Sequence, residues 1–349
     1  MIRKLLLPFS WIYGLALRFR HALYDRGIWK SRRSAITTIA IGNLALGGTG
    51  KTPMLELLLS MLHDVDVATL SRGYGRKGNE LREVSSMDDP AMSGDEPLQV
   101  KRKFPHVRVF VGADRVKALE QIRSMAPEVR VVVLDDALQH RRLVPDLKIL
   151  LTTYHRPYFT DALLPVGTLR DLAVRARYAD VVVVTKCPAP PPEEDQLLWR
   201  RKLGLDPAQE LYFSGIEYTD PKDLRSGAET GPLKEQNLLL VTGIADPAPL
   251  LAHLRPRCRQ LGHVAFPDHH RFTPGDGRAL AAQFSKFAPA PKLLITTEKD
   301  ATRLSPVIND GPLQDVPLAV IGMRTVIYNG PERFSALIKA YAGKNTKDS

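Results

Sequence analysis

The stretch that decides the fold spans residues 35–62 and reads AITTIAIGNLALGGTGKTPMLELLLSML. Its first part, residues 35–41, is apolar and rich in β-branched residues, which predicts a buried strand. A glycine-rich turn follows, and residues 53–62 are apolar at helical spacing. Pro53 suits the first turn of a helix, where its missing N–H costs little. The order strand, glycine loop, helix predicts a phosphate-binding loop.

The loop contains the residue types that phosphate binding requires. Glycines permit a tight turn and close approach of backbone N–H groups to oxygen atoms, and the helix N-terminus adds a favourable dipole. We predict Lys51 as the phosphate lysine and a catalytic residue, and Thr52 as a Mg²⁺ ligand. Ala45 stands where the strict pattern G-x-x-x-x-G-K-[ST] has glycine. The residues predicted to bind ATP are Ala45, Leu46, Gly47, Gly48, Thr49, Gly50, Lys51 and Thr52.

The remaining periodicity predicts an α/β fold. Apolar strand candidates alternate with helical stretches such as residues 115–125, which indicates a mostly parallel sheet with helices on both faces, as in P-loop NTPases. A second set of elements begins near residue 210 and indicates a smaller α/β domain. The predicted domains are an N-terminal helix over residues 1–30, a kinase-like core over 31–215 and the smaller domain over 216–349. The strand candidates lie at residues 66–70, 107–111, 131–134, 147–152, 180–185, 211–218, 238–242, 293–297 and 317–321.

Two adjacent carboxylates follow one of the predicted strands. Asp135 and Asp136 come directly after the apolar run 131–134. P-loop enzymes place an acidic residue at the end of a neighbouring strand to hold Mg²⁺. Adjacent carboxylates after a buried strand repel one another unless a cation lies nearby. We therefore predict that one of the pair faces the metal directly or through water, without a choice between them.

The opening segment and the net charge favour contact with an anionic surface. The net charge is +11, from 49 basic and 38 acidic residues, and such a balance attracts polyanions. Residues 2–24 alternate apolar and basic side chains, which suits either a helix in a membrane interface or one packed on the protein's own core. No apolar run reaches the roughly 18–20 residues of a membrane span. The basic residues are dispersed, without the aromatic and basic interleaving of RNA-binding proteins.

Eight motifs, in order, carry a family resemblance that extends to about residue 304. The chain resembles the tetraacyldisaccharide 4′-kinases, lipid A pathway enzymes that phosphorylate a membrane-bound glucosamine disaccharide. Ala137 stands where the family commonly has glycine, and Asp171 where it often has glutamate, which shortens the reach of that carboxylate. The motifs are residues 42–53 (GNLALGGTGKTP), 71–75 (SRGYG), 94–97 (GDEP), 112–115 (GADR), 134–140 (LDDALQH), 164–171 (LPVGTLRD), 266–270 (FPDHH) and 297–300 (TEKD).

The resemblance implies direct transfer of the γ-phosphate of ATP, with Mg²⁺, to the 4′-hydroxyl of a tetraacylated disaccharide 1-phosphate, which forms lipid IVA. It implies Asp95 as the base and His269, from the second domain, as its partner. It implies a peripheral enzyme at the cytoplasmic face of the inner membrane, with the lipid A disaccharide 1-phosphate and an anionic membrane surface as partners, and with neither nucleic acid nor an obligate protein partner. The residues expected at substrate or phosphate are Arg72, Tyr74, Arg115, Gln139, Arg170 and Asp171.

A P-loop nucleotide switch or partitioning ATPase is the alternative function. Its sites also contain a G-G-x-G-K-[ST] loop, but with a lysine directly before the two glycines. This chain has Leu46 at that position, which favours the kinase.

Overall fold

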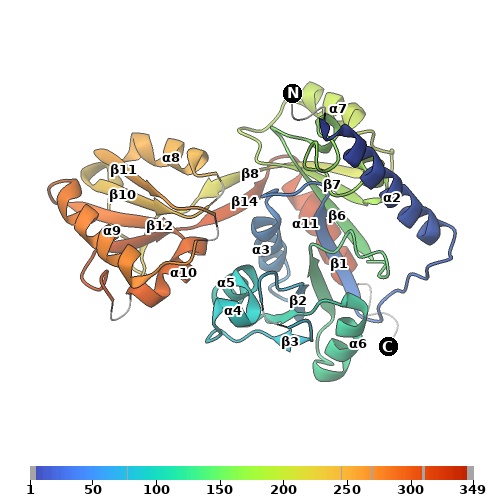
Figure 1. Ribbon diagram of the computed structural model, residues 1–349, viewed down its shortest axis with the longest axis horizontal. Helices are drawn as coiled ribbons and strands as arrows, with labels where there is room; N and C mark the ends of the chain where they lie inside the picture. The colour runs from blue at the N-terminus through green and yellow to red at the C-terminus, as the bar shows by residue number, and fades with distance from the viewer. Residues whose placement is uncertain (1–4, 77, 245, 269, 309–310, 344–349) are drawn as a thin grey trace. The chain divides into compact units, whose positions relative to one another are not determined.

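The computed structural model describes residues 5–76, 78–244, 246–268, 270–308 and 311–343. The chain forms two compact units, Met1–Ile216 with Thr325–Ser349, and Glu217–Arg324. Each unit is built on a mostly parallel sheet with helices against it (Figure 1). The predicted α/β fold class is confirmed.

The first unit contains a nine-stranded sheet. β1 lies at its centre and pairs in parallel with both β5 and β6, so that Ile41 stands opposite Asp135. In sheet order the strands are β14 (Met323–Ile327), β8 (Glu210–Tyr218), β7 (Val181–Thr185), β6 (Leu147–Thr153), β1 (Thr37–Asn43), β5 (Val131–Asp135), β2 (Val67–Ser71), β4 (Arg108–Val111) and β3 (Arg82–Glu83).

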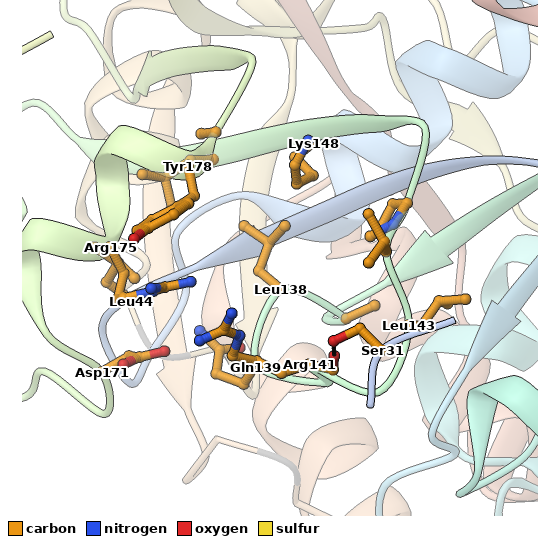
Figure 2. Close-up of a pocket in the computed structure, with 15 residues that line it drawn as sticks. Ser31, Leu44, Leu138, Gln139, Arg141, Leu143, Lys148, Asp171, Arg175 and Tyr178 are labelled. Atoms are coloured by element: carbon orange, nitrogen blue, oxygen red, sulfur yellow. Dashed lines mark hydrogen bonds between the residues drawn. The ribbon is translucent and has the colours of Figure 1, made fainter. Parts of the chain in front are cut away.

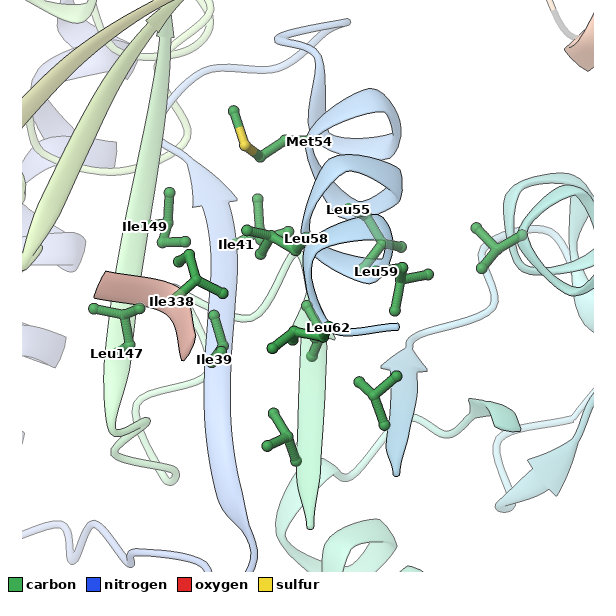
Figure 3. Close-up of a cluster of buried hydrophobic side chains, with 14 of the residues drawn as sticks. Ile39, Ile41, Met54, Leu55, Leu58, Leu59, Leu62, Leu147, Ile149 and Ile338 are labelled. Atoms are coloured by element: carbon green, nitrogen blue, oxygen red, sulfur yellow. The ribbon is translucent and has the colours of Figure 1, made fainter. Parts of the chain in front are cut away.

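Both faces of this sheet are buried, which is why its strands read as continuous apolar runs. On one face Ile39 and Ile41 of β1 share a core cluster with Met54 and Leu58 of α3 (Lys51–Met61), as Figure 3 shows. On the other face Ala40 belongs to a cluster that includes residues of α6 (Arg115–Met125). Each fully buried aliphatic side chain contributes about 1.5–3 kcal/mol, so this packing fixes the start of α3 at the end of β1.

The last segment of the chain returns to the first unit. β14 lies beside β8 in the large sheet, and Phe334 and Ile338 of α11 (Pro331–Ala342) share the core cluster of Ile41. The sequence predicts a single second domain over residues 216–349, whereas the segment from Thr325 onward belongs to the first unit. The difference arises because the pairing of distant strands is not visible in the sequence. The other helices of this unit are α2 (Leu7–Asp25), α4 (Pro90–Ser93), α5 (Asp95–Lys103) and α7 (Glu193–Lys202).

The second unit contains a five-stranded sheet. Its central strands pair in parallel, and an antiparallel edge strand closes one side. In sheet order the strands are β11 (Gln260–Ala265), β10 (Asn237–Thr242), β12 (Lys292–Thr297), β13 (Leu318–Ile321) and β9 (Lys222–Asp223). The helices are α8 (Ala248–Leu254), α9 (Pro274–Phe287) and α10 (Glu298–Ile308). Across the described ranges of both units, none of the helices is long and apolar enough to cross a membrane.

Candidate active site

The phosphate loop connects the carboxyl end of β1 to the start of α3. Gly47 and Gly50 have φ angles of 104° and 87°, which L side chains rarely adopt, so the turn requires glycine at both positions. The Asn43 amide donates to Thr49 Oγ1 (2.7 Å), and Thr185 Oγ1 donates to the Thr49 carbonyl (2.8 Å). The loop is therefore held in shape by the ends of β1 and β7.

The second carboxylate of the acidic pair lies among cations. Asp136 accepts a hydrogen bond from Arg170 (2.8 Å to Oδ2), and Lys51 Nζ lies 4.0 Å from the same oxygen. Burial by itself raises the pKa of Asp136, but Arg170, Lys51 and Arg115 outweigh burial and hold the pKa below its ordinary value. Asp136 is therefore ionised and links the phosphate lysine to Arg170.

The first carboxylate of the pair has no such hydrogen bond to a cation within the described part of the chain, although Lys51 and Arg115 lie near enough to act on its charge. Asp135 is buried at the end of β5, and its Oδ1 has no hydrogen-bond partner in the part of the chain that the structure describes. Burial, followed by the nearby Glu96 and Asp136 carboxylates, raises the pKa of Asp135 to about 7. A buried anion in this setting calls for a cation, since an unpaired buried charge is costly.

The residues present fit a Mg²⁺ ion bound together with a nucleotide. No cluster of three or more His, Cys, Asp or Glu side chains suited to a metal occurs among the described residues. Mg²⁺ is commonly held by one or two carboxylates together with phosphate oxygens and water. Asp135, with its unsatisfied oxygen, and Thr52, the second residue of α3, supply a donor set of that kind.

A group of arginines surrounds the carboxylates. Arg115 is buried at the start of α6 and donates to the carbonyls of Gly112 (3.1 Å) and Ala113 (3.0 Å). Burial lowers the pKa of Arg115, the cations Arg72 and Arg76 lower it further, and Asp135 and Asp136 oppose this. Cations gathered around a phosphate loop suit the oxygens of a triphosphate.

Three of the remaining predicted residues, Asp95, Tyr74 and Arg72, lie on the segment that follows β2. Asp95 begins α5 and Glu96 follows it, with the Glu96 carboxylate close enough to affect Asp135. Tyr74 is 90% exposed on the loop after β2, and Arg72 on the same loop is exposed. His269, the predicted partner of Asp95, lies outside the described residues.

Asp171 is directed toward helix α2. His21 Nε2 lies 2.6 Å from Asp171 Oδ1, and both side chains are buried. Arg141 donates to His21 Nδ1 (3.3 Å), which assigns the ring proton to Nε2 and makes it the donor to Asp171. The Tyr13 hydroxyl donates to the Arg170 carbonyl (2.8 Å), so α2 is attached to the segment that supplies Arg170.

A pocket lies beside this attachment. In Figure 2, Asp171, Gln139 and Arg141 gather on one side of it, while Leu138 and Leu143 supply apolar walls. The Gln139 amide donates to the Asn43 carbonyl (2.8 Å), which connects the pocket wall to the end of β1.

Buried side-chain atoms without a hydrogen-bond partner concentrate near the carboxyl edge of the large sheet. Among the described residues eight such atoms occur, and seven belong to this region, whereas Tyr212 lies elsewhere. Native proteins satisfy most buried polar groups, so the concentration marks a ligand site. The seven residues are Arg76, Ser93, Arg115, Asp135, Gln139, His140 and Arg170.

Three site residues were not singled out from the sequence. Asn43 and Glu96 stand inside quoted motifs, but only the structure shows Asn43 holding the loop and Glu96 facing Asp135. Lys186, at the end of β7, approaches Gly48 of the phosphate loop. Its position directly after a buried apolar strand was the available signal.

Comparison with known proteins identifies the family. The family model described as tetraacyldisaccharide-1-P 4′-kinase (LpxK) matches residues 2–342. The chain belongs to the tetraacyldisaccharide-1-P 4′-kinase family. Tetraacyldisaccharide 4′-kinase from Bacteroides thetaiotaomicron is 39% identical over 100% of this chain and 95% of its own length. The enzyme of that name from Flavobacterium johnsoniae is 37% identical over 99% and 98%.

A solved structure of the 4′-kinase family supports the same conclusion. LpxK from Aquifex aeolicus, crystallised in complex with ATP, matches with a TM-score of 0.76 and 28% identity, covering 98% of this chain and 99% of that one. The predicted membership of the 4′-kinase family is confirmed, as is the kinase class, and the ATP complex of this relative supports ATP binding.

Proposed function

We propose that this chain transfers the γ-phosphate of ATP to the 4′-hydroxyl of a tetraacylated glucosamine disaccharide 1-phosphate, the lipid A precursor. The observation that carries the proposal is the unsatisfied, buried Asp135 beside the phosphate loop of a chain from the 4′-kinase family. Lys51, Arg115 and Arg170 supply cations where a transferring phosphoryl group needs them.

Magnesium completes this proposal. Thr52 and Asp135 would hold the ion, which supplies charge neutralisation to the phosphate oxygens when bound. Asp136 instead keeps Arg170 and Lys51 in place through its hydrogen bond and ion pair. In this proposal Asp135 binds the metal, and Asp136 holds the two cationic side chains.

Asp95 is proposed as the base that takes the 4′-hydroxyl proton. Its support is the family motif over residues 94–97 and its position at the start of α5, next to Glu96. We expect Asp95→Asn to reduce turnover about 10²–10⁴-fold with little change in ATP affinity. Asp89→Asn, which alters the N-cap of the short helix α4, is the matched control. Equal turnover in wild type and Asp95→Asn would remove Asp95 from this role.

Helix α2 is proposed to lie on the anionic membrane surface. It packs on its own unit through a narrow face that includes Ser10, Gly14 and His21. The opposite face holds large apolar side chains in contact with solvent, among them Trp11 (72% exposed) and Phe19 (66% exposed). Exposed apolar residues next to arginines are typical of interfacial helices, and the need for ATP supports the cytoplasmic face as the side of contact.

Vesicle sedimentation tests the membrane contact. Trp11→Ser combined with Phe19→Ser should release the full-length protein from anionic vesicles, while the pair Leu197→Ser and Leu198→Ser, exposed on α7, serves as control. Neutral vesicles and high salt should weaken binding, since each basic residue near an anionic surface adds about 1 kcal/mol. Equal sedimentation of both double variants would contradict the contact.

A further inference from the structure

The end of strand β7 is fixed against the phosphate loop. Thr185 Oγ1 donates to the Thr49 carbonyl (2.8 Å) and lies close to the Thr152 carbonyl (3.3 Å). A Cβ placed on Gly50 would lie 3.8 Å from Thr185 Cβ, so the end of the strand leaves room for little more than a methyl group beside the loop. These contacts fix the position of the residue that follows Thr185 relative to the phosphate loop.

That residue, Lys186, has a left-handed backbone. Its φ of 58° is shared, among the described non-glycine residues, only by Asp136 (φ 52°), which follows β5. A positive φ is unfavourable for a residue with a Cβ, and such residues concentrate at functional sites. The bend is held by neighbouring hydrogen bonds, from Tyr154 N to the Thr185 carbonyl (2.9 Å) and from Cys187 N to the Ser214 carbonyl (2.9 Å).

The bend brings the Lys186 ammonium to the phosphate loop. A Cβ built on Gly48 would lie 3.9 Å from Lys186 Nζ and would meet no other atom outside its own neighbours within 4 Å. The side chain is half-buried, and Lys186 has neither a hydrogen bond nor an ion pair with the residues that the structure describes. Lys51, by contrast, already has Asp136 at 4.0 Å.

We propose that Lys186 is a second phosphate-binding cation of the nucleotide site, which contacts the phosphate oxygens of ATP from the β7 side of the loop. The inference rests on the proposed function, because it requires a nucleotide on this loop. A half-buried ammonium next to a phosphate loop finds its counter-charge in the nucleotide rather than in the protein. The cost of the left-handed backbone is then explained by the position it gives this side chain.

Nucleotide titration of the full chain tests the proposal. Lys186→Gln should weaken binding of a non-hydrolysable ATP analogue with Mg²⁺ about ten- to a hundredfold, and leave adenosine binding unchanged. Lys186→Arg should recover part of the affinity. Lys202→Gln, an exposed lysine at the end of α7, is the control and should bind like wild type.

Lys186→Gly separates this role from a structural one. Glycine adopts a positive φ without cost, so this variant should melt at or above the wild-type temperature and still lose affinity for the ATP analogue. Unchanged affinity in Lys186→Gln and Lys186→Gly would overturn the proposal. An equal loss for adenosine would also overturn it, since Lys186 would then contact the base or ribose.

Lys51→Ala distinguishes this inference from the proposed function. If Lys51→Ala loses ATP-analogue binding while Lys186→Gln does not, only the role of Lys186 is wrong. If neither variant changes binding, the nucleotide does not occupy this loop and the proposed function is contradicted as well.

Discussion

Two pairs of central strands, β1 with β5 and β10 with β12, hold similar places in two parallel sheets but end in different chemistry. In the first unit the strand ends lead to Asp135, with an unsatisfied oxygen, and to cations around it. In the second unit Asp300 is buried at the corresponding edge, where it accepts a hydrogen bond from Thr297 Oγ1 (2.9 Å) and pairs with Arg303 (3.4 Å).

The two sheet edges differ in what satisfies their buried polar groups. Arg303 also donates to the Gly243 carbonyl (3.1 Å) just after β10, so this polar cluster joins the two strand ends of the second unit. Within its described residues, the second unit contains no buried side-chain polar atom without a partner. Buried polar groups at the carboxyl ends of parallel strands thus form a ligand site where they lack hydrogen-bond partners within the protein. Where they hydrogen-bond to one another, they join the strand ends instead.

The largest expected effect comes from removing the phosphate lysine. Lys51→Ala should lower turnover by about 10²–10³-fold or more, because Lys51 stabilises charge on the transferring phosphoryl group. Initial rates of ADP release in the presence of lipid acceptor measure it. Lys202→Ala on α7 is the control. A folded Lys51→Ala protein with near-normal turnover would contradict the assignment of the first unit's edge as the ligand site.

Asp135→Asn should also abolish most turnover, yet stabilise the nucleotide-free protein at alkaline pH. The pKa of Asp135 is raised from 3.8 to about 7, so the folded state binds this proton more tightly than the unfolded state does. The associated stability is present at low pH and is lost as the pH rises through 7. Asparagine cannot ionise, so the variant should melt above wild type at pH 8 and alike near pH 4. A variant less stable at pH 8 would contradict this account of Asp135.

Much of the first edge could be predicted from the sequence. The phosphate loop and the run before Asp135 have short-range patterns, and the predicted strand at residues 131–134 differs from β5 by one residue. The placement of β14 and α11 could not be predicted, because it depends on pairing with β8 across the whole second unit.

Residues whose roles depend on shape were also beyond the sequence. A lysine after an apolar strand is a common pattern, and the positive φ of Lys186 cannot be predicted from the residue types around it. Asp171 was expected at substrate or phosphate, and its hydrogen bond to His21 joins segments that are 150 residues apart.

Asp300→Ala should have a moderate effect, on stability rather than on nucleotide binding. Removal of the carboxylate breaks the buried ion pair between Asp300 and Arg303, and breaking such a pair typically costs about 3–5 kcal/mol. Urea unfolding should show the loss, while the affinity for the ATP analogue stays within twofold of wild type. Full stability together with lost nucleotide binding would mean that this edge also serves the ligand.

The smallest expected effect is at the cap of α9. Thr273 and Asp276 form a capping box at its N-terminus, and Thr273→Ala removes both bonds of the Thr273 hydroxyl, which accepts from Asp276 N (3.2 Å) and donates to Asp276 Oδ2 (2.8 Å). The expected loss is about 1 kcal/mol in urea unfolding, with unchanged turnover. Thr273→Ser keeps the hydroxyl and should behave like wild type. A loss of stability as large as that of Asp300→Ala would contradict the expectation that the cap contributes less to stability than the buried ion pair.

The most direct test of the account is the phosphate transfer itself. The full chain is incubated with Mg²⁺, ATP and a tetraacylated glucosamine disaccharide 1-phosphate, and the lipid is analysed by mass spectrometry beside ADP release. The account predicts one added phosphate on the lipid for each ADP formed, with the product nearly absent in Lys51→Ala. ATP hydrolysis without a phosphorylated lipid, or equal product from Lys51→Ala, would contradict it.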